Sequence, residues 1–399
     1  MDRRHFIRSG AAGTLALLSA RLWAAGPADV KLLVVMLRGA YDGASLLVPY
    51  SSAFYYRARP VIAVPRPGSG DPNAAIALDS DWALNAAVRD SLHPLYTNRQ
   101  ALLVPFGGSG DLSRSHFQAQ DLMELGQGEG RLDYSSGFLD RLVEALSGKG
   151  QFGGVSFTNN LTPVFKGAVP VPNVSLRGNM RNTLPPRATE MIASLYEGTK
   201  LSGLAASGME TKRMVSAELM DEMAQSARGA GPARAFESRA RAIARLMRDR
   251  RSYSVGFADV GGWDTHVNQG SAQGALAANL SGLAGGLAAF AREMGPPWKS
   301  TVVVVMSEFG RTFRENGNRG TDHGHGNTLW VLGGGIAGGR IAGRQIAVNE
   351  ANLFQNRDFQ VLNDYRALLA YVFSRMYGLD SAALDRVLPG AKPGGYDFI

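Results

Sequence analysis

The chain has 399 residues, of which 45% are hydrophobic and 19% charged, and its formal net charge is +8. This composition is ordinary for a globular protein. The absence of cysteine excludes disulfide bonds and zinc sites built on thiolates, so any bound metal must take oxygen and nitrogen ligands. No block of Lys and Arg is interleaved with aromatic residues, so we expect no nucleic-acid partner.

The first 25 residues predict an export signal. Arg3 and Arg4 form a twin-arginine pair, residues 11–18 are weakly hydrophobic, and residues 23–25 offer small side chains for cleavage. We therefore expect the twin-arginine translocase to carry the protein to the periplasm or out of the cell. The hydrophobic run is too short to span a membrane, so no integral membrane segment should remain after cleavage. Cleavage would remove four arginines and one aspartate, a net +3, and would leave +5.

Several short apolar runs predict the strands of a central sheet. They cover residues 30–37, 101–106, 253–260, 301–306 and 328–332. Runs that are rich in β-branched residues and lack polar alternation are typical of strands buried on both faces of an α/β sheet. Because such sheets bind ligands beyond the carboxyl ends of their strands, the polar residues that follow each run are candidate site residues.

Helical patterns separate these runs and complete an α/β chain. We expect helices over residues 82–92, 117–125, 188–196, 212–227, 233–248, 271–294 and within 359–377. Residues 60–67 are proline-rich and predict an edge strand or an extended loop. Residues 185–250 are mostly helical and predict an insert within a single domain that covers residues 26–399.

Two carboxylates follow predicted strands directly. Asp42 comes after residues 30–37 in a glycine-rich turn, and Glu308 comes after residues 301–306. Asp42 has a second interpretation as a turn residue, since Asp-Gly is a common turn pair. Because Glu308 also follows a predicted strand, the sequence favours the ligand and turn interpretations of Asp42 equally.

Two clusters combine carboxylates with imidazoles, the oxygen and nitrogen ligands of divalent metals. Asp264 and His266 follow residue 260, where both side chains can converge from one turn. The alternative there is a turn with a packed tryptophan. Asp322, His323 and His325 form the second cluster, and the glycines on both sides of His325 allow a close approach to a ligand.

The turn after residues 101–106 holds a candidate nucleophile. It contains Ser113, Arg114, Ser115 and His116 ahead of a predicted helix. A hydroxyl in such a turn can attack a substrate, and the N–H groups of the first helical turn can hold an anion. The alternative is structural, because Ser115 and the glutamine three residues later form a capping-box pattern. The sequence does not separate Ser113 from Ser115.

Five motifs together resemble an exported bacterial family, catalogued as domain of unknown function 1501. They are Arg-Gly-x-x-Asp-Gly at 38–43, Ser-Arg-Ser-His-Phe at 113–117, Gly-Trp-Asp-Thr-His at 262–266, Ser-Glu-Phe-Gly-Arg-Thr at 307–312, and Gly-Thr-Asp-His-Gly-His-Gly at 320–326. That family is similar to the alkaline phosphatase and sulfatase superfamily. The resemblance implies a three-layer α/β/α sandwich with a mostly parallel central sheet, and one or two divalent metals at the strand ends.

The resemblance also implies a set of metal ligands. They are Asp42, Asp264, His266, Glu308 and Asp322, with His323 or His325 as the last histidine. Phe309 stands where the superfamily pattern has a histidine, so the number of ions, one or two, stays open. The ion itself is also open among Zn, Ca, Mg and Mn. The modified cysteine of sulfatases is excluded, which leaves a serine as the candidate nucleophile.

These features predict a periplasmic, metal-dependent hydrolase of phosphate or sulfate esters, acting on an anionic small molecule or glycan. Ser113 or Ser115 would attack, and His116 would act as acid or base. Arg114, Arg311 or the helix N-terminus would hold the transferred group. The alternative is a non-catalytic exported metal protein that binds an anionic glycan or a protein partner.

Overall fold

The computed structural model describes residues 30–128, 130, 132–147, 152–159, 161–176, 199 and 232–399. The predicted signal, the predicted helices over 188–196 and 212–227, and most of the predicted insert lie outside these residues. No helix within the described ranges combines the length and the apolar character needed to cross a membrane.

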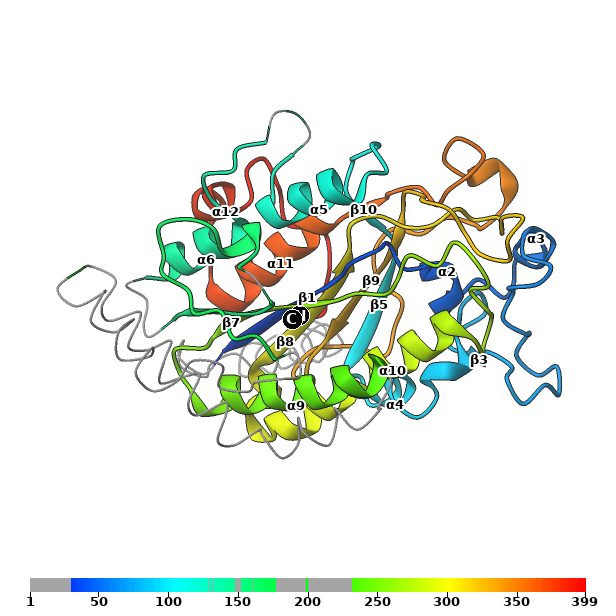
Figure 1. Ribbon diagram of the computed structural model, residues 1–399, viewed down its shortest axis with the longest axis horizontal. Helices are drawn as coiled ribbons and strands as arrows, with labels where there is room; N and C mark the ends of the chain where they lie inside the picture. The colour runs from blue at the N-terminus through cyan, green and yellow to red at the C-terminus, as the bar shows by residue number, and fades with distance from the viewer. Residues whose placement is uncertain are drawn as a thin grey trace, which may run out of the picture.

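A seven-stranded sheet lies at the centre of the molecule (Figure 1). In spatial order it contains β10 (Asn363–Asp364), β5 (Ala101–Gly108), β9 (Asn327–Leu332), β8 (Thr301–Ser307), β1 (Lys31–Leu37), β7 (Val255–Val260) and β6 (Gly154–Phe157). Strand β9 runs antiparallel to both of its neighbours, and the other pairings in this sheet are parallel. The prediction of a mostly parallel sheet is confirmed. A smaller sheet joins β2 (Leu47–Val48), β4 (Ala83–Leu84) and β3 (Ile76–Ala77).

Helices cover both faces of the large sheet, as Figure 1 shows. One face carries α5 (His116–Leu125), α6 (Phe138–Leu146), α11 (Tyr365–Tyr377) and α12 (Ser381–Val387). The other carries α4 (Leu92–Thr97), α9 (Pro232–Asp249) and α10 (Ala275–Met294), with α9 packed along α10. The shorter helices are α2 (Gly43–Leu46), α3 (Ala53–Ala58), η2 (Ala86–Val88), η3 (Pro163–Phe165), η4 (Pro296–Ser300) and η5 (Glu350–Asn352). The predicted three-layer α/β/α sandwich is confirmed.

Strand β1 shows why the sheet is buried on both sides. All seven of its residues are buried. Leu33 and Val35 pack into the core shared with α9 and α10, whereas Leu32 and Val34 pack into the core shared with α6 and α11. Successive side chains of a strand point to opposite faces, and burial of each Val or Leu stabilises the fold by about 1.5–3 kcal/mol. The central strands are thereby held firmly, and so are the loops at their carboxyl ends.

One of the predicted elements is wrong, and one open alternative is decided. Residues 82–92 form β4 and η2 instead of a helix, and α4 begins at Leu92, with Pro94 in its first turn, where proline is tolerated. The cause is tertiary, because the buried amide of Asn85 donates to the Ser45 carbonyl at 2.8 Å and accepts from the backbone of η2. Residues 60–67 form a loop, the second of the two predicted alternatives.

Candidate metal centre

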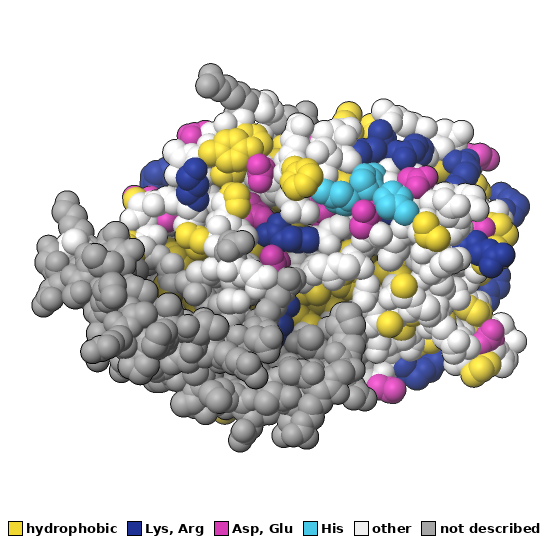
Figure 2. All heavy atoms as spheres, viewed as in Figure 1, with side chains coloured by type: hydrophobic (Ala, Val, Ile, Leu, Met, Phe, Trp, Pro, Cys, Tyr) yellow, Lys and Arg dark blue, Asp and Glu magenta, His cyan; other side chains and the backbone are white. Residues whose placement is uncertain are grey.

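Loops from three parts of the chain bring three histidines and one aspartate together beyond the carboxyl end of the sheet. His116 lies in the first turn of α5, Asp264 and His266 follow β7, and His323 precedes β9. Within the described part of the chain, ligand atoms of His116, Asp264 and His323 all lie within 4.8 Å of one another. Figure 2 shows the histidine side chains gathered on one face of the molecule. We call these four residues the histidine cluster.

The Nε2 atom of His323 occupies the middle of the histidine cluster. It lies 2.9 Å from Nε2 of His116 and 3.1 Å from Nε2 of His266. Oδ1 of Asp264 lies 2.8 Å from Nε2 of His266 and 3.3 Å from Nε2 of His323. Its Oδ2 lies 3.5 Å from Nε2 of His116. Nitrogen and carboxylate donor atoms therefore face a common centre.

Each imidazole is oriented from behind by an oxygen atom. The pairs, all through Nδ1, are His116 with Glu308 Oε1 at 2.8 Å, His266 with Asp322 Oδ1 at 3.1 Å, and His323 with the Arg114 carbonyl at 3.0 Å. An oxygen acceptor favours the proton on Nδ1, which leaves the Nε2 lone pair directed at the centre. Two facing Nε2 atoms at these distances either share a proton in an N–H···N hydrogen bond or bind a common cation. The donor set therefore fits a divalent metal ion of the kind that imidazole binds.

Neighbouring groups shift the pKa values of the cluster residues in different directions. The hydrogen bond to Glu308 raises the pKa of the His116 imidazole. Burial raises the pKa of the Glu308 carboxyl, but hydrogen bonds from His116 and Gln120 outweigh it, so that pKa lies below its ordinary value. Burial lowers the pKa of His323. The carboxylate is therefore charged, and the central imidazole is held neutral, as a metal ligand must be.

Arg311 holds the cluster carboxylate in place. Its Nη1 donates to Oδ1 of Asp264 at 2.6 Å, its Nε donates to Thr321 Oγ1 at 3.2 Å, and its Nη2 donates to the Thr321 carbonyl. Burial raises the pKa of Asp264, but Arg311 outweighs this and keeps that pKa low. The guanidinium has no solvent exposure. It therefore binds Asp264, and its predicted contact with a substrate stays a prediction.

Glu308 and Asp322, two further predicted ligands, each lie behind a histidine of the cluster. Glu308 is fully buried, and its Oε1 also accepts from Gly39 N at 2.8 Å and Gln120 Nε2 at 2.9 Å. Oδ1 of Asp322 accepts from Asn316 Nδ2 at 2.9 Å in addition to its contact with the imidazole. Both carboxylates orient ligands.

Asp42, the other predicted ligand, belongs to a separate buried ion pair. Its Oδ1 accepts from Arg59 Nη2 at 3.0 Å, and its Oδ2 accepts from Arg59 Nη1. Ser45 Oγ and Gln269 Nε2 also donate to Oδ2, each at 2.7 Å. Burial raises the pKa of Asp42, but Arg59 and these donors outweigh it, so the pKa is lowered. The structure therefore does not bring Asp42, a predicted metal ligand, into the histidine cluster.

A chain of hydrogen bonds leads from this ion pair to the histidine cluster. Because a carboxylate only accepts, Gln269 must turn its amide nitrogen to Asp42 and its Oε1 away. That oxygen accepts from Thr321 Oγ1 at 2.8 Å. Thr321 Oγ1 in turn accepts from Arg311 Nε, the side chain that binds Asp264. The direction of each bond therefore follows from the charge on Asp42.

His325, a predicted ligand, and Phe309 both pack against other aromatic rings. His325 is buried, with its ring 4.9 Å from that of Phe354, and burial lowers its pKa. Between the two open alternatives, the structure brings His323 to the cluster. Phe309 stacks on His116 at 5.0 Å and lies 5.2 Å from the ring of His323. It forms an apolar floor that fixes both ring planes.

Neither candidate serine is placed as a nucleophile. Ser113 Oγ donates to Asp111 Oδ2 at 2.6 Å and accepts from Ser115 N at 3.2 Å. Ser115 precedes α5, but its side chain makes no capping hydrogen bond, so the predicted capping box with Gln118 is also absent there. Among the described contacts, no hydrogen bond joins either hydroxyl to the histidine cluster.

Arg114 contributes its backbone to the site, and its side chain is engaged elsewhere. Its Nη2 donates to Gln355 Oε1 at 2.8 Å and to Asp358 Oδ2 at 2.9 Å. Its φ of 51° lies in the left-handed region, which is uncommon for a residue with a side chain. In this conformation its carbonyl meets Nδ1 of His323. The Arg114 carbonyl thus orients the His323 imidazole, and the predicted contact of its side chain with a substrate stays a prediction.

The sequence does not predict the contacts of some residues at the site. His116 is predicted as an acid or base, and the structure makes it a candidate ligand. Gln120 follows it by four residues, the spacing of one helix face, and both reach Glu308. This spacing is a usable signal. Arg59 offers no such signal, because nothing in the sequence ties it to Asp42.

The histidine cluster is open to solvent. The side chains of Asp264 and His266 are 44% and 39% exposed. Two cavities of about 420 and 180 Å³ lie elsewhere, beside Trp82 and Trp298 respectively. The cluster therefore lies on a surface accessible to a large substrate or partner.

Comparison with known proteins gives one family and a distant set of structures. The family described as "Protein of unknown function (DUF1501)" matches residues 108–388. No curated protein matches the sequence. The alkaline phosphatase from the Antarctic bacterium TAB5 is similar at 13% identity, over 76% of this chain and 91% of that chain, with a TM-score of 0.32. A mutant of that enzyme with bound Mg gives 13% identity, 76% and 90% coverage, and a TM-score of 0.31. At these scores the likeness carries no argument about activity.

Proposed function

We propose that this chain, which belongs to the DUF1501 family, is a metal-dependent hydrolase of phosphate or sulfate esters. One divalent ion would be held by His116, Asp264, His266 and His323. The observation that carries the proposal is the convergence of three Nε2 atoms whose Nδ1 partners are oxygen acceptors. A nitrogen-rich set favours Zn²⁺ or a neighbouring transition metal over Ca²⁺ and Mg²⁺, which prefer oxygen.

The residues around the ion have distinct tasks. A divalent ion, when bound, supplies a Lewis acid that lowers the pKa of water and offsets negative charge on an ester. Glu308 and Asp322 hold the Nδ1 protons of His116 and His266, so that both Nε2 atoms remain acceptors. Arg311 keeps Asp264 charged. The chain thus prepares the donor atoms before the ion arrives.

Water, and not a serine, is the proposed nucleophile. Ser113 is bonded to Asp111, and no described hydrogen bond connects Ser115 to the histidine cluster. The open surface around the cluster gives water access. The net charge of +8, or +5 after the predicted cleavage, favours an anionic substrate, because a basic protein attracts anions.

We also propose that the protein is exported from the cytoplasm. The twin-arginine pattern of residues 1–25 supports transport by the twin-arginine translocase and a periplasmic or secreted location. This route carries folded proteins, so a metal could be loaded before export.

Turnover assays test the hydrolase proposal. Purified protein would be incubated with aryl phosphate, phosphodiester and aryl sulfate in the presence of Zn²⁺, Mn²⁺, Co²⁺, Ca²⁺ or Mg²⁺. We expect hydrolysis with at least one pair, loss of it in His323→Ala, and retention in His93→Ala, a histidine of α4 outside the cluster. Absence of turnover in every combination would contradict the proposal.

A non-catalytic role is the second candidate, and one observation favours it. Among the described residues, no hydrogen bond joins a serine or threonine hydroxyl to the histidine cluster, and Arg114 and Arg311 are engaged in protein contacts. In this case the metal would support binding of an anionic glycan or a protein partner. Metal-dependent glycan binding without turnover would distinguish this role from hydrolysis.

A further inference from the structure

Two exposed hydrophobic side chains directly follow histidines of the cluster in the sequence. Six large ones are exposed among the described residues, namely Val61, Leu112, Phe117, Tyr134, Leu161 and Val267. Phe117 follows His116 directly and is 86% exposed, the highest value of the six. Val267 follows His266 and is 58% exposed. Two candidate ligands are therefore each followed by an apolar side chain open to solvent.

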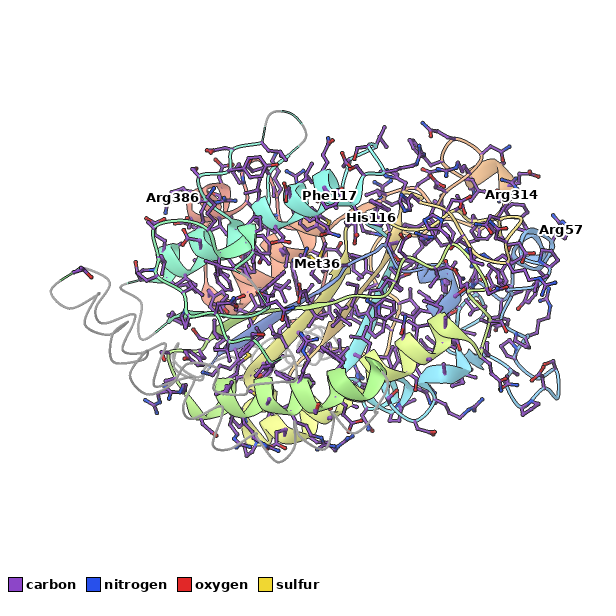
Figure 3. The ribbon with its side chains drawn as sticks, viewed as in Figure 1. Met36, Arg57, His116, Phe117, Arg314 and Arg386 are labelled. Atoms are coloured by element: carbon purple, nitrogen blue, oxygen red, sulfur yellow. The ribbon has the colours of Figure 1, made fainter. Side chains whose placement is uncertain are left out.

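Phe117 lies on the same face as the cluster. Figure 3 shows Phe117 and His116 next to each other at the start of α5. Figure 2 shows hydrophobic side chains beside the histidine patch on the same face. Single exposed apolar residues are normal on protein surfaces, so exposure alone would mean little. The position next to a candidate metal centre is what gives it meaning.

Two arginines near the cluster are engaged in protein contacts. Arg311 is bound to Asp264 and Thr321, and Arg114 is bound to Gln355 and Asp358. The open surface beside the cluster presents Phe117 as contact area for the part of a substrate beyond its anionic group.

We infer that the substrate is an ester with an apolar aryl or alkyl group, which packs on Phe117 and Val267. This inference rests on the proposed function, since the anionic part of the ester would lie at the ion. Covering an aromatic ring with a second apolar group removes both surfaces from water. Phe117 is therefore a specificity-determining residue for the group attached to the ester oxygen.

Binding of non-hydrolysable phosphonates tests this specificity. Metal-loaded full-length protein would be titrated with phenylphosphonate and methylphosphonate by calorimetry. We expect phenylphosphonate to bind about tenfold more tightly in the wild type, from the added apolar burial. In Phe117→Ala the ratio should fall to about twofold or less, and in Val267→Ala it should fall part of the way.

Val61→Ala is the matched control. Val61 is 56% exposed and follows α3, outside the cluster, so its removal should leave the phenyl-to-methyl ratio at the wild-type value. Because Phe117 is exposed, its substitution should not unfold the chain, which thermal unfolding checks. Equal affinity for the two phosphonates in the wild type, or a ratio that survives Phe117→Ala, overturns this inference and leaves the proposed function standing. Failure of both phosphonates to bind overturns the proposed function itself.

Discussion

The histidine cluster and the Asp42–Arg59 pair both follow central strands, yet their polar atoms meet different partners. Both oxygens of Asp42 accept hydrogen bonds from the guanidinium of Arg59, and both side chains are buried. In the histidine cluster, the Nε2 atoms of His116 and His266 lie 2.9 and 3.1 Å from that of His323, and all three are backed by oxygen acceptors. One group is complete within the chain, whereas the other offers nitrogen and oxygen donor atoms to a cation.

This difference separates a structural carboxylate from a functional cluster. A buried charge with a guanidinium partner stabilises the fold only while the partner remains. Imidazoles that point their acceptors at one another, with their other nitrogens fixed, are arranged as metal ligands are. A carboxylate after a strand is therefore a weak sign of a metal site, and an oxygen behind each imidazole is a stronger one.

The largest effect is expected when the buried Asp42–Arg59 ion pair is broken. Asp42→Asn leaves the guanidinium of Arg59 buried without its counter-charge, so we expect a loss of about 3–5 kcal/mol in the free energy of unfolding. Urea denaturation followed by circular dichroism measures it. His266→Ala, on the solvent-exposed cluster, is the comparison variant and should cost far less stability. A fully stable Asp42→Asn would show that the ion pair is not structural.

Low pH should remove the stabilisation that the Asp42–Arg59 ion pair provides. The pKa of Asp42 is lowered in the folded chain, so its contribution is complete above the unfolded-state pKa, about 3.9. It is then lost as pH falls through the lower folded-state value. The stability difference between wild type and Asp42→Asn should therefore be constant at neutral pH and shrink below about pH 4. A difference that shrinks on raising the pH from 6 to 8 would contradict this assignment.

Glu308→Gln tests the orienting shell of the cluster. The amide accepts a hydrogen bond from His116 less strongly than the carboxylate, so metal affinity should fall by about 10–100-fold. Competition with a chromogenic chelator measures the dissociation constant. Glu350→Gln, which alters an exposed carboxylate paired with Arg314, should leave affinity unchanged. Equal affinities in the two variants would remove Glu308 from the site.

The smallest predicted effect tests the hydrogen-bond chain between the two regions. Gln269→Leu interrupts the path from Asp42 to Thr321 and Arg311, so we expect roughly threefold weaker metal binding, below the range for groups that contact a ligand directly. Asn363→Leu is the control, since Asn363 is a buried amide that bonds the Pro105 and Arg344 carbonyls instead. If both variants bind metal like the wild type, the two regions are independent.

The sequence predicts the scaffold well because its strands are distinctive. The apolar runs of β1 and β8 have no other stable place than a sheet covered on both faces. The helix predicted over residues 82–92 fails because the contacts of Asn85 come from residues far away in the chain. The local sequence pattern contains no information about such long-range contacts.

The site is predicted in part for the same reason. Asp264, His266 and His323 stand out by residue type and by position after or before strands. Which carboxylate touches an ion and which stands behind an imidazole depends on side-chain direction, and no spacing reveals that for Glu308. The pairing of Asp42 with Arg59 likewise requires the fold. A polar residue after a strand indicates where the site lies. The side chain that it contacts in the fold determines whether it binds an ion, orients an imidazole or forms an ion pair.

Titration of metal-free protein with Zn²⁺ tests the central claim most directly. Calorimetry would give the stoichiometry and affinity for wild type, His323→Ala and the His93→Ala control. The account predicts one ion per chain in wild type and in His93→Ala, with binding lost or severely weakened in His323→Ala. Absence of binding in the wild type, or equal binding in His323→Ala, would contradict it.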